Sequence, residues 1–511
     1  MAFSWTVHGD GRTLAPGEVV RPDERLSWGR TVGLGAQHVV AMFGATFVFP
    51  LVMGLNPQLA IMMSGIATIC FLLIVNGRVP SYLGTSASFV GGVAAIRAQE
   101  GTSADVTGAI LVAGAVLAVV GLIIHLAGPR VIYAVLPPVV TGAVVMLIGF
   151  NLAPVVAHIY WPQDQWVAFT VMVAVIAMSV GLRGFLGRIA VFLGLLFGYV
   201  LSWVLDRWLG QITAPDGAGK VSTHWRVNFD PVSQASWFGL PPKSTVVNGT
   251  ELVGWHLPEL RWAFVLLVLP AVIALIAENT GHVKAVAEMT GTDLDPYMGR
   301  AIVADGIGTV LATSVGGSPT TTYAENIGVM AATRVYSTAA YYVAAVVAIL
   351  FGLSPKFGAL VAATPGAVLG GITVVLYGMI GLLGAKIWRE NHVDFGNPVN
   401  LVPVAAGIII AIGDTALKFS STFVLSGIAL GTIVTIAGWH VARWLAPHDM
   451  AEAAMVTMGP TLILNEPGMY AEPNPYPQTS EPVEPGERAA GAGLPGHDGE
   501  SHPNRPVPPG R

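Results

Sequence analysis

The stretch 313–337 constrains the fold of this chain more than any other part of the sequence. It lies between apolar runs long enough to span a membrane, yet it opens with Gly316, Gly317 and Pro319 and carries a carboxylate, Glu325. Gly and Pro break or delay a helix, and non-helical backbone at membrane depth is tolerated only inside protein or beside a cavity. We therefore predict an extended segment leading into a half-helix, with Glu325 near the helix start facing a polar ligand.

Three consecutive threonines, Thr320, Thr321 and Thr322, precede that half-helix. Because hydroxyl side chains are common N-caps, we predict that one of them caps a short helix beginning near Tyr323. The alternative is an ordinary re-entrant loop whose glutamate satisfies stray backbone groups.

The composition indicates that lipid solvates most of the chain. Of its 511 residues, 53% are hydrophobic and only 11% are charged, whereas soluble domains hold roughly 25% charged residues. The net charge of −5 gives no sign of a nucleic-acid partner. The expected class is an all-α polytopic membrane protein in contact with membrane lipid.

Fourteen segments carry enough apolar residues to cross a bilayer, for which about 20 are needed. Two of them, the third and the tenth, are short and interrupted. The predicted segments are 33–53, 57–76, 82–96, 106–127, 131–151, 166–183, 186–206, 262–281, 300–315, 321–333, 337–353, 358–385, 400–416 and 421–444.

Polar regions flank this transporter domain, which we place at residues 31–445. Residues 1–30 are predicted as a cytosolic N-terminal tail and 207–261 as an extracytoplasmic loop. Residues 446–511 are rich in Pro, Gly and Glu, which is typical of a disordered tail. Lys and Arg gather on the side that holds the N-terminus, so the positive-inside rule places both termini in the cytoplasm.

The two interrupted segments each occupy the third position of a group of seven. Each combines turn formers with hydroxyl side chains, at residues 80–89 and 318–325. Broken spans at matching positions of two halves are the best sequence indication of a transporter site. Because seven is an odd number of spans, the second half must run inverted, and the two half-helices then direct partial positive charges at one ligand.

Glu278 is a candidate functional acid because it follows the apolar run 262–277. A carboxylate inside a bilayer costs a few kcal/mol on insertion scales, so such acids are functional candidates by default. His282 lies four residues on and hence on the same helical face, and an acid beside an imidazole is typical of a proton-carrying site. The alternative is that both residues lie at the cytosolic boundary and are merely solvated.

Glu325 has the chemistry to recognise a planar heterocycle. A carboxylate accepts two hydrogen bonds, which matches adjacent N–H donors, while backbone N–H groups at a helix start serve carbonyl acceptors. That pairing suits an imide-like ring better than a sugar or a simple anion, although glutamate also binds cations and amines.

Three further polar residues lie inside apolar runs. Asp305 either relays protons or binds a neighbouring helix, and the sequence does not decide between the two. His38 is the type of residue that forms hydrogen bonds between helices more often than it binds a ligand. Tyr377 is placed to line the cavity opposite the site.

Other chemistries find no support in the sequence. There is no phosphate-binding loop of the G-x-x-x-x-G-K-[ST] type, no clustered Cys/His spacing for a metal and no serine in a G-x-S-x-G context. We therefore expect a protein that is not an enzyme and that holds no cofactor or metal, with the proton as its coupling ion.

Four motifs in order resemble the nucleobase–ascorbate transporter family, also called nucleobase:cation symporter-2. They are QHVVAMFGATFVFP (37–50), RVPSYLGTSASF (78–89), AENTGH (277–282) and TTYAENIGVMAATRVYS (321–337). The last two are most similar to its bacterial uracil permeases, including those of the pyrimidine-utilisation type. The resemblance covers roughly residues 23–445.

This resemblance implies 14 segments in two inverted repeats of seven. Segments 1–4 and 8–11 would form a core domain and segments 5–7 and 12–14 a gate domain. Short strands would lie in segments 3 and 10, and the protein would be a homodimer of the cytoplasmic membrane. Transport would be proton-coupled uptake in which the core moves against the gate.

The resemblance also assigns roles to residues. Glu278 and Glu325 match the glutamates that contact the base, His282 matches the histidine neighbour, and the backbone at Ala324 and Ala87 would bind the ring. Uracil permeases often have phenylalanine at the position of Ala87, so this chain departs from their pattern there.

Four other residues match supporting positions in the family. Ala45 and His38 belong to the first segment, Asp305 to the ninth, and Tyr377 to the gate domain. Together with Glu278 and His282, the residues His38 and Asp305 are our candidates for proton coupling, and Ala45 and Tyr377 are candidates for substrate contact.

The expected function is therefore proton-coupled uptake of uracil or a related nucleobase. The nearest rival is a xanthine or urate permease of the same fold. Two rivals from other classes are an anion transporter of related architecture, which two acids in the site disfavour, and a receptor or scaffold that transports nothing.

Overall fold

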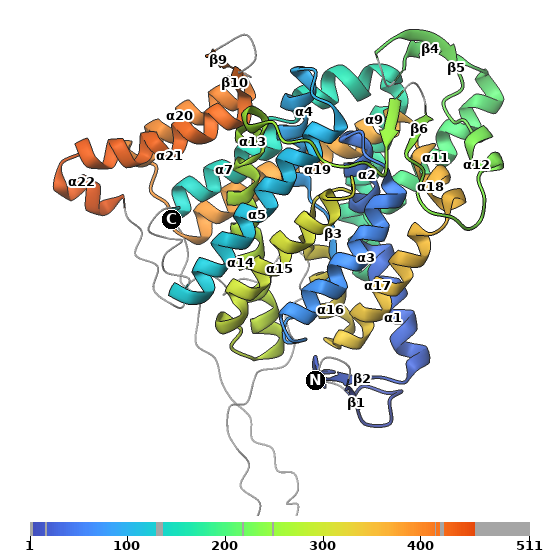
Figure 1. Cartoon of the computed structure of the whole chain (residues 1–511), viewed down its shortest axis with the longest axis horizontal. Coiled ribbons are helices and arrows are strands. Elements are labelled where there is room, and N and C mark those ends of the chain that lie inside the picture. The colour runs from blue at the N-terminus through green and yellow to red at the C-terminus, as the bar shows by residue number, and fades with distance from the viewer. Residues whose placement is uncertain are drawn as a thin grey trace, which may run out of the picture. The chain divides into compact units, whose positions relative to one another are not determined.

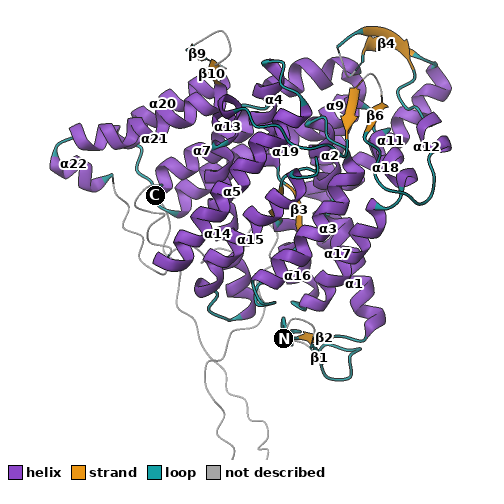
Figure 2. Ribbon diagram, viewed as in Figure 1, coloured by secondary structure: helices purple, strands orange, loops and turns teal. Residues whose placement is uncertain are grey.

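Helices dominate the structure of this chain, which is a computed structural model (Figures 1 and 2). The residues that it describes are 4–15, 18–128, 136–216, 219–247, 250–413, 415–419 and 424–454.

The described residues contain eight helices or helix runs that are long and apolar enough to cross a membrane. A ninth candidate is a pair of helices bent by 83°. The chain is therefore a multi-pass membrane protein, and the finer count of fourteen segments stays a prediction. The eight candidates are Trp28–Val52, Pro57–Ile74, Ser103–Ala127, Pro138–Gln163, Ala190–Leu209, Trp262–Thr290, Gly366–Glu390 and Gly427–Leu445.

Figure 1 labels most of the elements that follow one another along the chain. The helices up to the long loop are α1 (Trp28–Ala41), α2 (Phe43–Val52), α3 (Pro57–Ile74), η1 (Ala87–Phe89), α4 (Val90–Ala98), α5 (Ser103–Ala127), α7 (Pro138–Phe150), α8 (Ala153–Val155), η2 (Val156–Tyr160), η3 (Trp161–Gln163), α9 (Gln165–Gly181), α10 (Gly184–Arg188) and α11 (Ala190–Leu209). The later helices are α12 (Asp230–Gln234), α13 (Trp262–Val268), α14 (Pro270–Thr290), α15 (Asp295–Thr313), α16 (Ala324–Thr333), α17 (Thr338–Gly352), α18 (Pro355–Ala362), α19 (Gly366–Glu390), α20 (Pro398–Ile412), α21 (Gly427–Leu445) and α22 (His448–Ala453).

Within the described parts of the chain, ten short strands form five separate pairs. Four of these pairs join neighbouring strands in the sequence, whereas β3 pairs with β8 across more than 200 residues. The strands are β1 (Thr6–Val7), β2 (Glu24–Arg25), β3 (Leu83–Thr85), β4 (Ile212–Pro215), β5 (Val221–His224), β6 (Ser244–Val247), β7 (Thr250–Val253), β8 (Thr320–Thr322), β9 (Ala416–Lys418) and β10 (Val424–Ser426).

The helices pack in two groups. In one group α15 packs against α5 and α3, and α17 packs against α3 and α1. In the other group α19 packs against α7 and α9, α20 against α21 and α7, and α11 against α9. The strand pair β3–β8 lies in the first group, where β3 contacts α3 and β8 contacts α15.

Several predicted boundaries differ from the structure. The predicted span 358–385 is divided, because α18 ends at Ala362 and α19 begins at Gly366, directly after Pro365. Residues 446–511 were expected to be disordered, yet 448–453 form the short helix α22. The rest of that tail, from residue 455, lies outside the described residues.

The N-terminal region holds more structure than a tail requires. Strand β1 pairs in parallel with β2, and the Trp5 indole N–H donates to Thr338 Oγ1 at 2.8 Å. Val20 forms an isolated bridge with Val335. The described residues 5–15 and 18–25 are therefore attached to the end of α16 and the start of α17.

The antiparallel pair β3–β8 confirms the short strands expected in the two interrupted segments. Leu83 lies opposite Thr322, Gly84 opposite Thr321 and Thr85 opposite Thr320. No other strand of the described residues lies beside the pair, so its outer edges need other hydrogen-bond partners.

Two buried threonine hydroxyls satisfy these outer edges. The N–H of Leu83 donates to Thr68 Oγ1 of α3 at 2.9 Å. On the other strand the N–H of Thr320 donates to Thr309 Oγ1 of α15 at 3.1 Å, and the same hydroxyl donates to the Thr320 carbonyl at 2.9 Å. The helices behind the strands therefore replace the missing neighbours.

The prediction that a threonine caps the half-helix was wrong. Thr320, Thr321 and Thr322 form β8, and α16 begins at Ala324 with Tyr323 in the N-cap position. Pairing with β3 overrides the capping preference, and β-branched threonine fits a strand well.

The first prediction tests the close packing of β3. A Cβ atom at Gly84 would lie 2.2 Å from Met42 Cε and 2.9 Å from both Thr46 Oγ1 and Tyr323 Cε2. Gly84→Ala should therefore destabilise the protein by about 1–3 kcal/mol, as overpacking does, and lower its unfolding temperature in detergent. Gly33→Ala on α1 is the matched control, because nothing lies within 4 Å of its added Cβ. Equal unfolding temperatures for both variants would contradict this packing.

Candidate functional site

Three carboxyl groups from different helices lie close together beside β8. Glu278 of α14 lies close enough to Asp305 of α15 and Glu325 of α16 for their charges to interact. Asp305 is fully buried, whereas Glu278 and Glu325 are partly accessible. The structure thus brings together Glu278 and Glu325, which the sequence predicts to bind the ligand, and Asp305, for which the sequence leaves two roles open.

The start of α16 offers backbone donors beside these acids. Its N-cap residue, Tyr323, makes no side-chain cap hydrogen bond, and Glu325 lies in the first turn. Ala324 is exposed, so its amide belongs to an uncapped helix start, where N–H groups and the helix dipole favour an acceptor.

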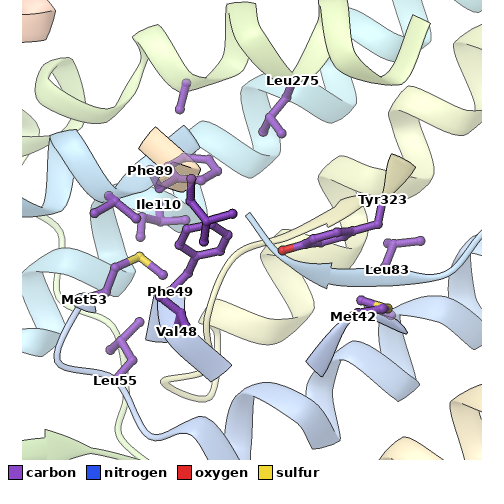
Figure 3. Packing of buried hydrophobic residues seen from close by; sticks show 14 of the residues in the cluster. Met42, Val48, Phe49, Met53, Leu55, Leu83, Phe89, Ile110, Leu275 and Tyr323 are labelled. Atoms are coloured by element: carbon purple, nitrogen blue, oxygen red, sulfur yellow. The ribbon is translucent and has the colours of Figure 1, made fainter. Parts of the chain in front are cut away.

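Tyr323 links the two interrupted segments. Its side chain is buried, and its hydroxyl donates to the carbonyl of Thr85 at the end of β3. Figure 3 shows its ring on the side of Leu83 and Met42, with its hydroxyl directed toward the group of apolar residues that includes Phe49 and Phe89. The sequence analysis gave this tyrosine no role. Its position between the three threonines and Glu325 was the sequence feature that could have indicated one.

The other interrupted segment turns into a helix within a few residues of β3. Ser86 follows the strand and accepts a hydrogen bond from the Ser88 N–H at 3.3 Å, which starts η1 at Ala87. Ala87 is half-buried. Each strand of the β3–β8 pair is therefore followed at once by a helix start, as expected for two half-helices.

A continuous hydrogen-bond chain joins His282 to Asp305. His282 Nδ1 lies 2.7 Å from Thr322 Oγ1, which donates to Asn279 Oδ1 at 3.1 Å. The amide of Asn279 then donates to Asp305 Oδ2 at 2.7 Å. Asp305 thus binds a neighbouring helix, and the chain connects it to the candidate proton-carrying histidine.

Asn279 and Thr322 are functional candidates that the sequence reasoning missed. Asn279 is fully buried, as is Thr322 apart from 2% of its surface. An asparagine between Glu278 and Thr280 in an apolar helix was a usable signal. The role of Thr322 depends on the register of β8, which a single sequence does not reveal.

His38 lies apart from this chain of hydrogen bonds. It is 1% exposed, its Nδ1 lies 3.1 Å from Asn326 Oδ1, and its ring stacks at a tilt on Tyr341 with centroids 4.4 Å apart. This is the interhelical role that the sequence favoured for it.

The structure does not bring Tyr377 into the acid cluster. Tyr377 lines a separate cavity of about 420 Å³ with Phe150, Trp161 and other residues of α7, η2 and α19, and none of the acids lines it. Its hydroxyl is buried without a partner among the described residues. Ala45 lies on α2, and its side chain is outside the described part of the structure.

Broken helices with acids beside a helix start inside a multi-pass protein are typical of transporter sites. The model of the permease family that comprises xanthine and uracil permeases matches residues 29–418. The chain belongs to this family, the nucleobase–ascorbate transporters.

Individual relatives cover most of the chain. RutG of Escherichia coli (strain K12), assigned as a pyrimidine permease, is 45% identical over 425 residues, which are 82% of this chain and 90% of RutG. The uracil permease of Bacillus caldolyticus is 35% identical over 423 residues, 81% of this chain and 92% of that protein.

A solved structure resembles the fold at low sequence identity. The murine anion transporter Slc26a9, in its inward-facing state, superimposes with a TM-score of 0.54 at 12% identity and covers 81% of this chain and 68% of its own. This likeness concerns the fold alone.

The second prediction tests how α15 holds β8. Thr309→Val removes the hydroxyl that accepts a hydrogen bond from the Thr320 N–H and donates one to the Thr320 carbonyl. The variant should therefore lose about 1–3 kcal/mol of stability and bind the ligand more weakly. Thr313→Val is the matched control, because Thr313 is equally buried on α15 and its hydroxyl donates to the carbonyl of Thr309 in its own helix at 2.8 Å. Unfolding temperature and ligand affinity should fall for the first variant only; equal effects would contradict the role of Thr309.

Proposed function

We propose that this permease is a proton-coupled symporter that imports uracil across the cytoplasmic membrane. The observation that carries the proposal is the cluster of Glu278, Asp305 and Glu325 beside the uncapped start of α16. The names of the relatives, a pyrimidine permease and a uracil permease, support the substrate class.

The site has the donors and acceptors that a uracil ring requires. Uracil has two ring N–H groups and two carbonyl oxygens. Carboxylates of Glu325 and Glu278 accept from N–H groups, while backbone amides at Ala324 and Ala87 donate to carbonyls. Tyr323 keeps the two helix starts together through its hydrogen bond to Thr85.

The proton is proposed to enter the same cluster. Three negative charges close together in a site of low polarity repel one another, so a proton on Glu278 or its partner His282 favours the binding of a neutral base. The loaded core then moves inward against the gate, and loss of the proton to the cytosol releases the base. Asp305 is connected to His282 through the hydrogen-bond chain, and His38 supports the neighbouring α16 through Asn326.

For the architecture we propose 14 segments in two inverted repeats, with both termini in the cytoplasm. The two packing groups of helices support a core of segments 1–4 and 8–11 and a gate of segments 5–7 and 12–14. Thr68 accepts a hydrogen bond from the first N–H of β3, and Thr309 accepts one from the first N–H of β8. Each threonine lies on the helix that precedes its interrupted segment, which supports the repeat. A homodimer remains part of the proposal.

The gate is proposed to contribute Tyr377 when the core moves. In this structure it lines a cavity with Phe150 and Trp161, which are flat side chains suited to a planar ring. Ala45, on α2, would support the opposite wall of the site.

A xanthine or urate permease is the second candidate function. Ala87 is a small residue at the start of η1, which leaves more room for a purine than a phenylalanine would. Competition of labelled uracil uptake by unlabelled thymine, xanthine and urate decides between these substrates. Currents carried by sulfate or bicarbonate would instead favour an anion transporter, and normal function only with residues 455–511 present would favour a scaffold.

The third prediction concerns energy coupling. Uptake of labelled uracil into vesicles should rise with an inward proton gradient and fall to the equilibrium level when a protonophore collapses it. An imposed gradient of sodium at constant pH is the control and should have no effect. Concentrative uptake that survives the protonophore would contradict proton coupling.

The fourth prediction concerns Glu325. Glu325→Gln replaces a charged acceptor by a group that is half donor, and hydrogen bonds to charged groups contribute about 1.5–3 kcal/mol, so uracil affinity should fall roughly 10- to 100-fold. Glu288→Gln is the matched control, because Glu288 is exposed near the end of α14. Equilibrium binding of labelled uracil to purified protein measures both, and an unchanged affinity for Glu325→Gln would contradict the assignment.

A further inference from the structure

The hydrogen-bond chain from Asp305 to His282 has a defined direction. Asn279 Nδ2 lies within bonding distance of two acceptors, Asp305 Oδ2 at 2.7 Å and the Leu275 carbonyl at 3.0 Å. The side-chain nitrogen of Asn279 must therefore face Asp305 and the Leu275 carbonyl, and its side-chain oxygen must face the Thr322 hydroxyl. Since an amide oxygen only accepts, the Thr322 hydroxyl donates to it.

This direction fixes the protonation of the imidazole at Nδ1. The Thr322 hydroxyl has one proton, and that proton points to Asn279. His282 Nδ1 lies 2.7 Å from the same oxygen, so the contact is a hydrogen bond only if Nδ1–H is the donor. In the neutral ring the other nitrogen, Nε2, is then a bare acceptor.

We propose that Asn279 and Thr322 are positioning residues that hold His282 in its Nδ1–H tautomer, so that Nε2 is the atom which accepts the coupled proton. The ring keeps its Nδ1–H bond to Thr322 in both the neutral and the charged form. Protonation at Nε2 therefore leaves the chain intact, and His282 can gain and lose a proton without moving its neighbours.

The surroundings hold this arrangement in place. Thr322 ends β8, whose outer edge is bound by Thr309 of α15, and His282 is partly accessible. Besides His282 itself, the elements joined by the chain carry nine ionisable side chains: Glu278, Lys284 and Glu288 on α14, Asp295, Tyr297, Arg300 and Asp305 on α15, and Tyr323 and Glu325 at the start of α16.

The direct test is the tautomer of His282, which does not depend on the substrate. Nitrogen NMR of protein labelled with ¹⁵N-histidine, at a pH where the ring is neutral, distinguishes a protonated Nδ1 from a protonated Nε2. The His282 signals are identified by their loss in His282→Gln. The wild type should show protonated Nδ1 and bare Nε2, whereas a predominant Nε2–H form would overturn the proposal.

Two variants break the hydrogen-bond chain at Thr322 or Asn279, and two others control for general effects of substitution. Thr322→Val removes the acceptor for Nδ1–H, and Asn279→Ala frees the Thr322 hydroxyl to donate to Nδ1, so both should shift His282 toward the Nε2–H tautomer. Thr322→Ser keeps the hydroxyl and should retain the wild-type spectrum. Thr290→Val is the matched control, because the Thr290 hydroxyl on α14 donates to the Val286 carbonyl of its own helix at 2.8 Å. An unchanged tautomer in both Thr322→Val and Asn279→Ala would overturn the proposal.

Transport provides the second readout and rests on the proposed function. With loss of one neutral hydrogen bond, Thr322→Val should raise the KM for labelled uracil at saturating proton gradient about five- to tenfold, and Thr322→Ser should restore it. Wild-type protein that takes up no uracil would contradict the proposed function, while the NMR result still decides the tautomer. A normal KM in Thr322→Val together with uptake by the wild type would contradict a role for the chain in transport.

Discussion

The need to satisfy backbone N–H and C=O groups within the membrane controls the structure around the site. Two segments of this chain leave the helical conformation at that depth, and each solves the problem by pairing with the other, as β3 and β8. Thr68 and Thr309 then satisfy the outer edges. Because the pair is completed by hydroxyls rather than by further strands, it fits between α3 and α15. The start of α16 that follows β8 has no side-chain cap from Tyr323.

The position of the acids follows from this pairing. Strand β8 lies against α14 and α15, so its last residue reaches His282 and Asn279 while the next residues start α16 with Glu325. The strands are rigidly attached on one side, and the acid cluster lies at their end. Binding of a ligand at this cluster would depend on the arrangement of the helices and strands that carry the acids.

The sequence predicted the elements whose signals are local. Intramembrane acids are costly, and Gly/Pro interruption is unusual inside a span, so Glu278 and Glu325 were found and the structure places them close together. Contacts that depend on long-range register are not predictable in this way: the sequence predicts that one of three threonines caps the half-helix, and it gives no role to Asn279. The sequence predicts that Tyr377 lines the cavity opposite the site, whereas the structure places it in a cavity that none of the acids lines, because its place depends on how two groups of helices face each other.

The most direct test of this account is an experimental structure of the protein with uracil bound. The account predicts that the ring lies at the ends of β3 and β8, in contact with the carboxylates of Glu278 and Glu325 and with the amide of Ala324. A ring found in the cavity beside Tyr377, with no contact to either carboxylate, would contradict it.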